Sequence, residues 1–166
     1  MLKWVRIKER EKTTWVQFLA DCHQLLDAAI ASDGSPKGNI QLFNPNVSAL
    51  QIVAQRGFDI AFLQQFEFVR FDEPSACGRA FRLGRRVMIP DIHKDRVYMP
   101  YLSIAQASGY RAVQSTPIIR SDGAVIGVLS THFAQTHEWS DAAQRALDSY
   151  ADQMAALVAG LAENLH

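Results

Sequence analysis

The sequence has little cysteine, no excess charge and no long apolar run, and each absence narrows the class of protein. Only two of its 166 residues are cysteines, Cys22 and Cys77, and they form neither a CxxC pair nor a Cys/His metal spacing. This pattern favours reduced thiols in a cytoplasmic protein over a disulfide scaffold or a zinc site. Seventeen Lys and Arg balance seventeen Asp and Glu, so charge gives no reason to expect nucleic acid or a membrane as a partner.

Membrane and enzyme signatures are also missing. No apolar run approaches the roughly 20 residues of a membrane-spanning helix, and the basic N-terminal residues precede no signal-peptide stretch. No HExxH, GxSxG, glycine-rich phosphate loop or Ser-His-Asp order occurs, so hydrolase and nucleotidase activities have no residues to support them. His93, His132 and His137 would form a metal site only if folding brought them together, and we expect no metal.

What the sequence does have is enough apolar residues for one buried core. Hydrophobic residues make up 48% of the chain and charged residues 20%, which is typical of a globular domain. Apolar residues at helical spacing predict a long first helix that starts at an N-cap on Thr14 and ends at SDGSPKG. We therefore expect an N-terminal extension over residues 1–13 and a single domain over 14–166.

Strands and short helices are predicted next along the chain. NIQLF and LQIVA flank the turn-rich NPNVSA and predict a β-hairpin, and residues 60–69 form a helical patch. A short helix capped by Ser75 and stopped by Gly84 precedes the strand RVMIP, and an irregular loop then leads to a helix that Gly109 ends. This order predicts a mixed α/β (α+β) fold with a mostly antiparallel sheet.

Residues 111–133 predict two further strands joined by a turn at Asp122-Gly123. In that register the facing polar pairs are Ser115 with Ser130 and Gln114 with Thr131. One face then carries Val113, Ser115, Ile119, Ile126, Val128, Ser130 and His132, and the other carries Gln114, Thr116, Ile118, Val125, Leu129 and Thr131. Both faces are apolar near the turn, which indicates central strands covered on both sides. The polar residues must therefore form an internal hydrogen-bonded network or line a cavity, and the sequence leaves both open.

Ser140 is expected to cap a last helix that runs to the C-terminus. Its apolar residues follow an a/d pattern at Ala143, Leu147, Tyr150, Met154, Leu157 and Leu161. We expect the stripe of Leu147, Tyr150, Met154, Leu157 and Leu161 to form a symmetric dimer bundle with the first helix. The alternative is that both helices pack entirely inside one monomer.

Five blocks, GNIQLFNP, LQIVAQRGF, SACGRAFRLGRRVMIPDI, SGYRAVQSTPIIRSDGAVIGVLSTHF and the closing amphipathic helix, resemble in this order the GAF domains of bacterial sensory proteins, especially those joined to sensor histidine kinases. The resemblance implies a central antiparallel sheet of five or six strands, with the terminal helices on one face and a small-molecule pocket on the other. It implies a sensory homodimer that binds a small molecule of unknown identity and acts on a histidine kinase or another signalling partner. A ligand-free dimerisation module is the alternative.

Departures from the family pattern narrow this expectation. The stretch from Asp91 to Gln114 has no cysteine, so no covalent bilin is expected, and the cofactor is unknown. The ordered Asn-Lys-Phe-Asp-Glu signature of cyclic-nucleotide-binding members is absent, because FDE at residues 71–73 comes too early. Nothing after Leu161 could hold a kinase, so the chain is expected to be a stand-alone or excised domain.

The resemblance, together with the polar strand positions, gives a set of candidate pocket residues. These are Cys77, Asp91, Tyr98, Tyr101, Gln114, Thr116, Ser130 and His132. The two strand faces cannot line one cavity, and the sequence does not decide between them.

Cys77 also supports an alternative as an enzyme, because GAF-fold reductases of free methionine sulfoxide use a thiolate. A helix N-terminus beside Arg79 would lower the pKa of the thiol. That chemistry needs a resolving cysteine, and Cys22 lies on the first helix. We therefore expect a domain without catalytic residues, with the reductase as the less favoured alternative.

Overall fold

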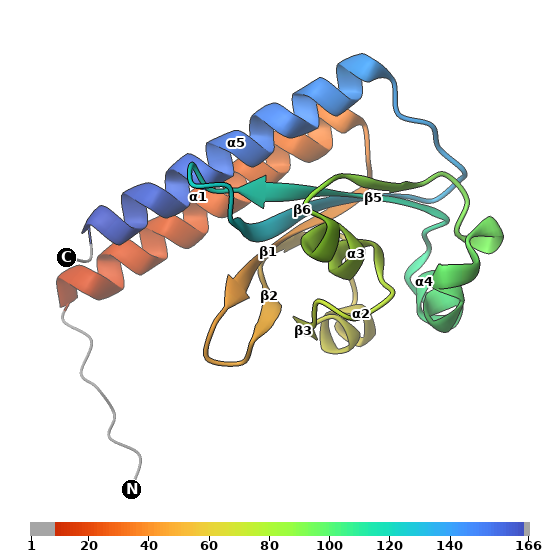
Figure 1. Ribbon diagram of the computed structural model, residues 1–166, viewed down its shortest axis with the longest axis horizontal. Coiled ribbons are helices and arrows are strands. Elements are labelled where there is room, and N and C mark those ends of the chain that lie inside the picture. The colour runs from red at the N-terminus through yellow and green to blue at the C-terminus, as the bar shows by residue number, and fades with distance from the viewer. Residues whose placement is uncertain (1–8, 165–166) are drawn as a thin grey trace, which may run out of the picture.

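The computed structural model describes residues 9–164 and arranges them as a curled six-stranded antiparallel sheet between two layers of helices (Figure 1). The strands are β1 (Lys37–Asn44), β2 (Ala49–Arg56), β3 (Phe68–Val69), β4 (Val87–Ile89), β5 (Ala112–Ile119) and β6 (Val125–Phe133), in the order β3-β2-β1-β6-β5-β4. The predicted fold class and sheet size are confirmed.

The two long helices lie side by side on one face of the sheet, and the short helices lie on the other (Figure 1). The long pair is α1 (Glu9–Asp33) and α5 (Asp141–Asn164). The short elements are α2 (Ile60–Gln65), α3 (Ala76–Leu83), the 3-10 turns η1 (Ile92–Lys94) and η2 (Arg96–Tyr101), and α4 (Leu102–Ser108). We call the two sides of the sheet the terminal-helix face and the connector face.

The helix boundaries follow the predicted capping residues. The Ser75 hydroxyl accepts a hydrogen bond from the amide of Gly78, and α3 ends at Gly84 with a φ of 65°. Gly109 ends α4 in the same left-handed conformation, with a φ of 73°, which costs glycine little because it has no Cβ. Ser140 caps α5 by accepting from the amide of Ala143 at 3.1 Å.

Two predicted boundaries are wrong. Thr14 is not an N-cap, because α1 already begins at Glu9 and the Thr14 hydroxyl donates to the carbonyl of Arg10 inside the helix. The helix expected over 60–69 stops at Gln65. Val69 instead pairs with Leu50 of β2, because a strand pairing between distant residues outweighs local helical spacing.

The predicted register of the β5–β6 hairpin is confirmed at its open end. Ser115 pairs with Ser130, and Gln114 pairs with Thr131. A register shift near the turn pairs Ile119 with Val125. One extra residue in β6 changes the face to which its neighbours point, so Ile126 packs on the terminal-helix side rather than beside Val128 as predicted.

The sheet separates two hydrophobic cores. On the connector face, α2, α3, η2 and α4 bury a cluster rich in aromatic rings. On the terminal-helix face, α1 and α5 bury mainly aliphatic side chains against β1, β2, β5 and β6. No helix within residues 9–164 is long and apolar enough to cross a membrane.

Candidate functional site

The connector face holds a small internal cavity against the middle of the sheet. Its volume is about 10 Å³, which is room for about one water molecule. Strands β1, β5 and β6 form its floor, and α2, α3 and η2 form its roof. The lining residues are Asn39, Gln41, Phe62, Phe66, Ser75, Ala76, Cys77, Tyr98, Val113, Ser115, Ser130 and His132. We call this space the sheet cavity.

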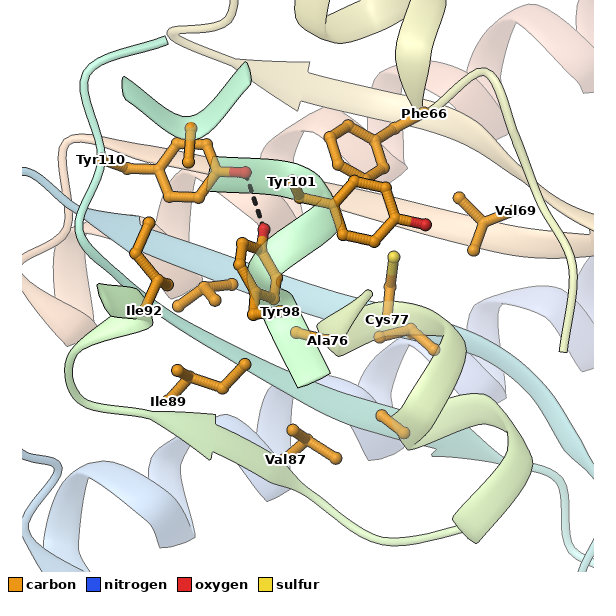
Figure 2. Packing of buried hydrophobic residues seen from close by; sticks show 14 of the residues in the cluster. Phe66, Val69, Ala76, Cys77, Val87, Ile89, Ile92, Tyr98, Tyr101 and Tyr110 are labelled. Atoms are coloured by element: carbon orange, nitrogen blue, oxygen red, sulfur yellow. Dashed lines mark hydrogen bonds between the residues drawn. The ribbon is translucent and has the colours of Figure 1, made fainter. Parts of the chain in front are cut away.

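Aromatic rings form much of the roof of the sheet cavity. The hydroxyls of Tyr98 and Tyr110 meet at 2.7 Å, and Tyr101, Phe66 and Cys77 lie beside them (Figure 2). Burial raises the pKa of both hydrogen-bonded tyrosines, so their hydroxyls stay neutral. The hydrogen bond satisfies both hydroxyls. It also holds η2, which carries Tyr98, against the start of β5, which follows Tyr110.

The polar atoms of the floor are less well satisfied. Six buried side-chain atoms of the described residues have no hydrogen-bond partner, and three of them, Asn39 Oδ1, Gln41 Oε1 and His132 Nδ1, belong to residues that line the cavity. Leaving such a group unpaired costs roughly 1–3 kcal/mol. Three unpaired atoms around one cavity are therefore the feature of this site that calls for a ligand or a water.

His132 is held in its neutral form. Burial is the largest cause and the nearby Lys37 ammonium the second, and together they lower the pKa of His132 to about 3. The ring is enclosed edge-on by Phe58 and Tyr110, with centroid distances of 4.9 and 4.7 Å. At neutral pH the imidazole therefore offers the cavity a dipole rather than a charge.

Gln114 and Thr116, predicted as pocket residues, point to the terminal-helix face instead. Thr131 accepts from the Gln114 amide at 3.1 Å and donates to the Asp33 carboxylate at 2.6 Å. The Thr116 hydroxyl donates to Gln114 Oε1 at 2.6 Å. These residues form a hydrogen-bonded network, so for them the structure answers the question left open by the sequence.

Two ionic side chains connect this network to the terminal helices. Arg86 donates to the Thr116 hydroxyl at 3.0 Å and to the Gln144 carbonyl of α5 at 2.8 Å, and it also pairs with Asp148. Asp33, the last residue of α1, accepts from Trp139 at 3.3 Å. The strands that floor the cavity are thereby tied to both long helices.

Asp91 lies outside the sheet cavity. Its carboxylate accepts two hydrogen bonds from Arg111 at 3.0 Å and one from the amide of His93. The Arg111 guanidinium holds the pKa of Asp91 below its usual value. The residue caps η1 and fixes the connector to β5, which is a structural role.

Four of the eight predicted pocket residues, Cys77, Tyr98, Ser130 and His132, line the cavity. Tyr101 packs in the surrounding cluster and donates to Glu73 at 3.1 Å. The sequence reasoning missed Asn39 and Gln41. Their signal was available, because these amides alternate with apolar residues in the strand β1, but nothing local revealed that β1 pairs with β6.

Cys77 does not have the environment predicted for a reactive thiol. Burial raises its pKa to about 11, outweighing its hydrogen bond with Ser75. Arg79 pairs with Asp95 at 3.0 Å. Cys22 is buried in the core of the opposite face, so the sheet separates the two thiols.

The α5 stripe is divided between the core and the surface. Leu147 and Met154 are each 1% exposed and pack beneath the helix, so they are unavailable to a second subunit. Tyr150, Leu157 and Leu161 are partly buried at the edge of the same core. The large exposed apolar side chains of this layer lie on α1, at Trp15, Val16 and Leu19.

Within the described part of the chain, no group of three His, Cys, Asp or Glu side chains could hold a metal ion. His137 stacks on Phe133 with a centroid distance of 3.6 Å, whereas His132 lies in the connector-face core. The histidines are therefore not brought together.

A family model for the GAF domain matches residues 17–158, and the chain belongs to this family. No curated protein sequence matches the chain.

Solved structures of low sequence identity share the fold. One is a domain of a Sinorhizobium meliloti protein assigned as a two-component sensor histidine kinase, with 16% identity and a TM-score of 0.68 over 86% of this chain and 91% of that one. A second is the free methionine-R-sulfoxide reductase of Neisseria meningitidis in complex with its substrate, with 17% identity and a TM-score of 0.72 over 93% and 86%. A third is the blue-light absorbing form of the PixJ GAF domain of Thermosynechococcus elongatus, with 19% identity and a TM-score of 0.66 over 90% and 87%.

Proposed function

We propose that this GAF domain is a sensory module that binds a small molecule non-covalently in the sheet cavity. The observation that carries the proposal is the group of three buried, unpartnered polar atoms around that cavity, on Asn39, Gln41 and His132. Occupancy would supply the missing hydrogen bonds. Because only about 10 Å³ is open, a ligand larger than water must displace lining side chains as it enters.

The same strands offer a route from the cavity to the terminal helices. Ser115 and Ser130 face the cavity, and their neighbours Thr116 and Thr131 bond Arg86 and Asp33 on the other side. A displacement of β5 or β6 on ligand binding would therefore be transmitted to both long helices. For this to act as a switch, the ligand must have different affinities for the two arrangements of the helices.

We further propose that the output passes through a homodimer formed by the terminal helices, acting on a histidine kinase or another signalling partner. The exposed Trp15, Val16 and Leu19 on α1 support a helical interface, with Tyr150, Leu157 and Leu161 of α5 at its edge.

We also propose a cytoplasmic location, with which the buried free thiols Cys22 and Cys77 agree.

Native mass spectrometry of the purified protein, beside a denatured sample, tests both the binding of a small molecule and the formation of a dimer. A dimer that carries a discrete mass lost on denaturation supports the sensor. Hydrogen exchange should then show different protection of α1 and α5 with that molecule bound and after its removal. A dimer with no extra mass would favour the ligand-free dimerisation module, and unchanged helix protection with the molecule bound would contradict the proposed transmission to the helices.

The dimer has a test of its own. Val16→Glu should convert the dimer to a monomer in light scattering, because it places a charge in the proposed interface. Ile60→Glu on α2 is the matched control, because Ile60 is 70% exposed and Val16 69%, and it should leave the dimer intact. Equal behaviour of the two variants would place the interface elsewhere.

The reductase is the second candidate, because structural relatives include free methionine-R-sulfoxide reductases. The raised pKa of Cys77 and the separation of the two thiols argue against it. We expect no turnover of free methionine sulfoxide with dithiothreitol. Turnover that Cys77→Ser abolishes would establish the enzyme instead.

A further inference from the structure

The unpaired polar atoms of the sheet cavity indicate which chemical class of ligand would fit it. Gln41, Asn39 and His132 are 0%, 3% and 4% exposed, and one atom of each lacks a hydrogen-bond partner. The hydroxyls of the lining are paired, since those of Ser115 and Ser130 bond each other at 2.7 Å and that of Ser75 bonds Cys77 at 3.4 Å. The unsatisfied atoms therefore define what a ligand must supply.

Gln41 requires a donor. Its amide nitrogen donates to the Phe66 carbonyl at 3.4 Å, so the nitrogen is directed there and the amide oxygen is the atom left unpaired. Asn39 likewise has its oxygen unpaired. A carbonyl oxygen has lone pairs and no proton, so these two oxygens accept hydrogen bonds and cannot donate them.

The lining offers no charge to a ligand. None of its residues is Asp, Glu, Lys or Arg, and His132 is neutral, because burial and Lys37 lower its pKa to about 3. The Lys37 ammonium itself is directed away, donating to the Ser108 carbonyl at the end of α4. A charged molecule would therefore lose its hydration without gaining a counter-charge.

The shape of the site favours a flat molecule. Phe62, Phe66 and Tyr98 line the cavity, and aromatic rings pack most closely on other flat groups. Phe62 is in α2 and Phe66 is its C-cap. Both rings must move to enlarge the cavity enough for a ring-sized ligand.

We infer that the sheet cavity selects an uncharged, planar molecule whose N–H groups donate hydrogen bonds to Gln41 and Asn39. The inference rests on the proposed function, since it names the class of ligand for the same site. It excludes anions such as carboxylates and phosphates, and it excludes flat molecules that only accept hydrogen bonds.

Three probes of similar size test the class. Indole is neutral and has one N–H donor, benzofuran has the same shape with an acceptor oxygen in place of the N–H, and indole-3-carboxylate keeps the donor but adds a negative charge. Titration followed by NMR shifts of the His132 ring should show indole binding about tenfold more tightly than benzofuran, which is the ratio expected for one hydrogen bond. Indole-3-carboxylate should not bind.

A pair of variants ties the preference to one atom. Gln41→Leu should bind indole and benzofuran with similar affinity, whereas the exposed Gln135→Leu should keep the wild-type preference. Equal affinities in the wild-type protein, binding of indole-3-carboxylate, or no binding of either neutral ring would each overturn the inference. An anion found by native mass spectrometry would overturn the ligand class alone, whereas the absence of any ligand effect on the helices would overturn the proposed function.

Discussion

The two faces of the β5–β6 hairpin carry similar numbers of buried polar side chains but use them differently. On the terminal-helix face, Gln114, Thr116 and Thr131 bond one another and the ionic groups Arg86 and Asp33. On the connector face, the serine pair is satisfied while His132, together with amides from β1, is left with unpaired atoms. Polar residues that alternate along the same strands therefore form a structural network on one side and line the sheet cavity on the other.

The difference in hydrogen bonding between the two faces should affect the stability of the folded state. A satisfied buried network stabilises a protein and fixes its geometry, whereas an unsatisfied group destabilises the folded state until a partner arrives. Substitutions on the terminal-helix face should thus lower stability, and some on the connector face should not.

Thr131→Val should have the largest effect. The substitution keeps the shape of the side chain but removes the donor to Asp33 and the acceptor for Gln114. Because one Asp33 oxygen is already unpartnered, we expect a loss of about 2–3 kcal/mol, as for a buried hydrogen bond to a charged group. Urea unfolding measures it, with the exposed Thr136→Val as control. A loss no larger than the control's would mean that the network is not stabilising.

His132 predicts an acid-sensitive stability. Its folded pKa of about 3 lies below the usual 6.5, so between these values the unfolded chain binds a proton that the folded chain does not. Stability therefore falls as pH decreases through this window, by about 2 kcal/mol from pH 7 to pH 5. His132→Leu should remove that part of the pH dependence, whereas the exposed His93→Leu should keep it. Parallel stability curves for wild type and His132→Leu would contradict the prediction.

The fold was largely predictable because its signals are local or repeated. Caps at Ser75 and Ser140 and the turn at Asp122-Gly123 act through neighbouring residues. The turn brings β5 and β6 together, and Ser115 pairs with Ser130 as predicted, with a register shift lying between this pair and the turn. The misplaced end of the helix at residues 60–69 shows the limit. There a pairing with Leu50 decided the structure, and such a contact leaves no trace in local spacing.

The candidate site was only half predictable for the same reason. The sequence showed that polar residues gather at one end of the hairpin, but not which face the terminal helices cover. Gln41 entered the site through pairing of β1 with β6, where it lies opposite Val128. A site assembled from strands far apart in sequence depends on the order of the strands in the sheet, which the register of a single hairpin does not determine.

Arg86→Lys should have a smaller effect than Thr131→Val. Lysine keeps the charge but cannot contact Thr116, the Gln144 carbonyl and Asp148 together, as the guanidinium does. We expect a loss of about 1 kcal/mol and faster hydrogen exchange at the start of α5. Arg120→Lys, at an exposed pair with Asp122, is the control and should leave unfolding unchanged. Equal effects would show that the fork geometry of Arg86 does not matter.

Gln41→Leu should have the smallest effect, and of opposite sign. Leucine has nearly the same volume and removes a buried acceptor that has no partner, at the cost of one long hydrogen bond to Phe66. We expect the free energy of unfolding to rise by up to about 1 kcal/mol, measured by urea unfolding of protein freed of any bound molecule. A clear loss of stability would mean that the Gln41 oxygen already has a partner, such as a fixed water, in the empty protein. The contrast between the two faces would then rest on Asn39 and His132 alone.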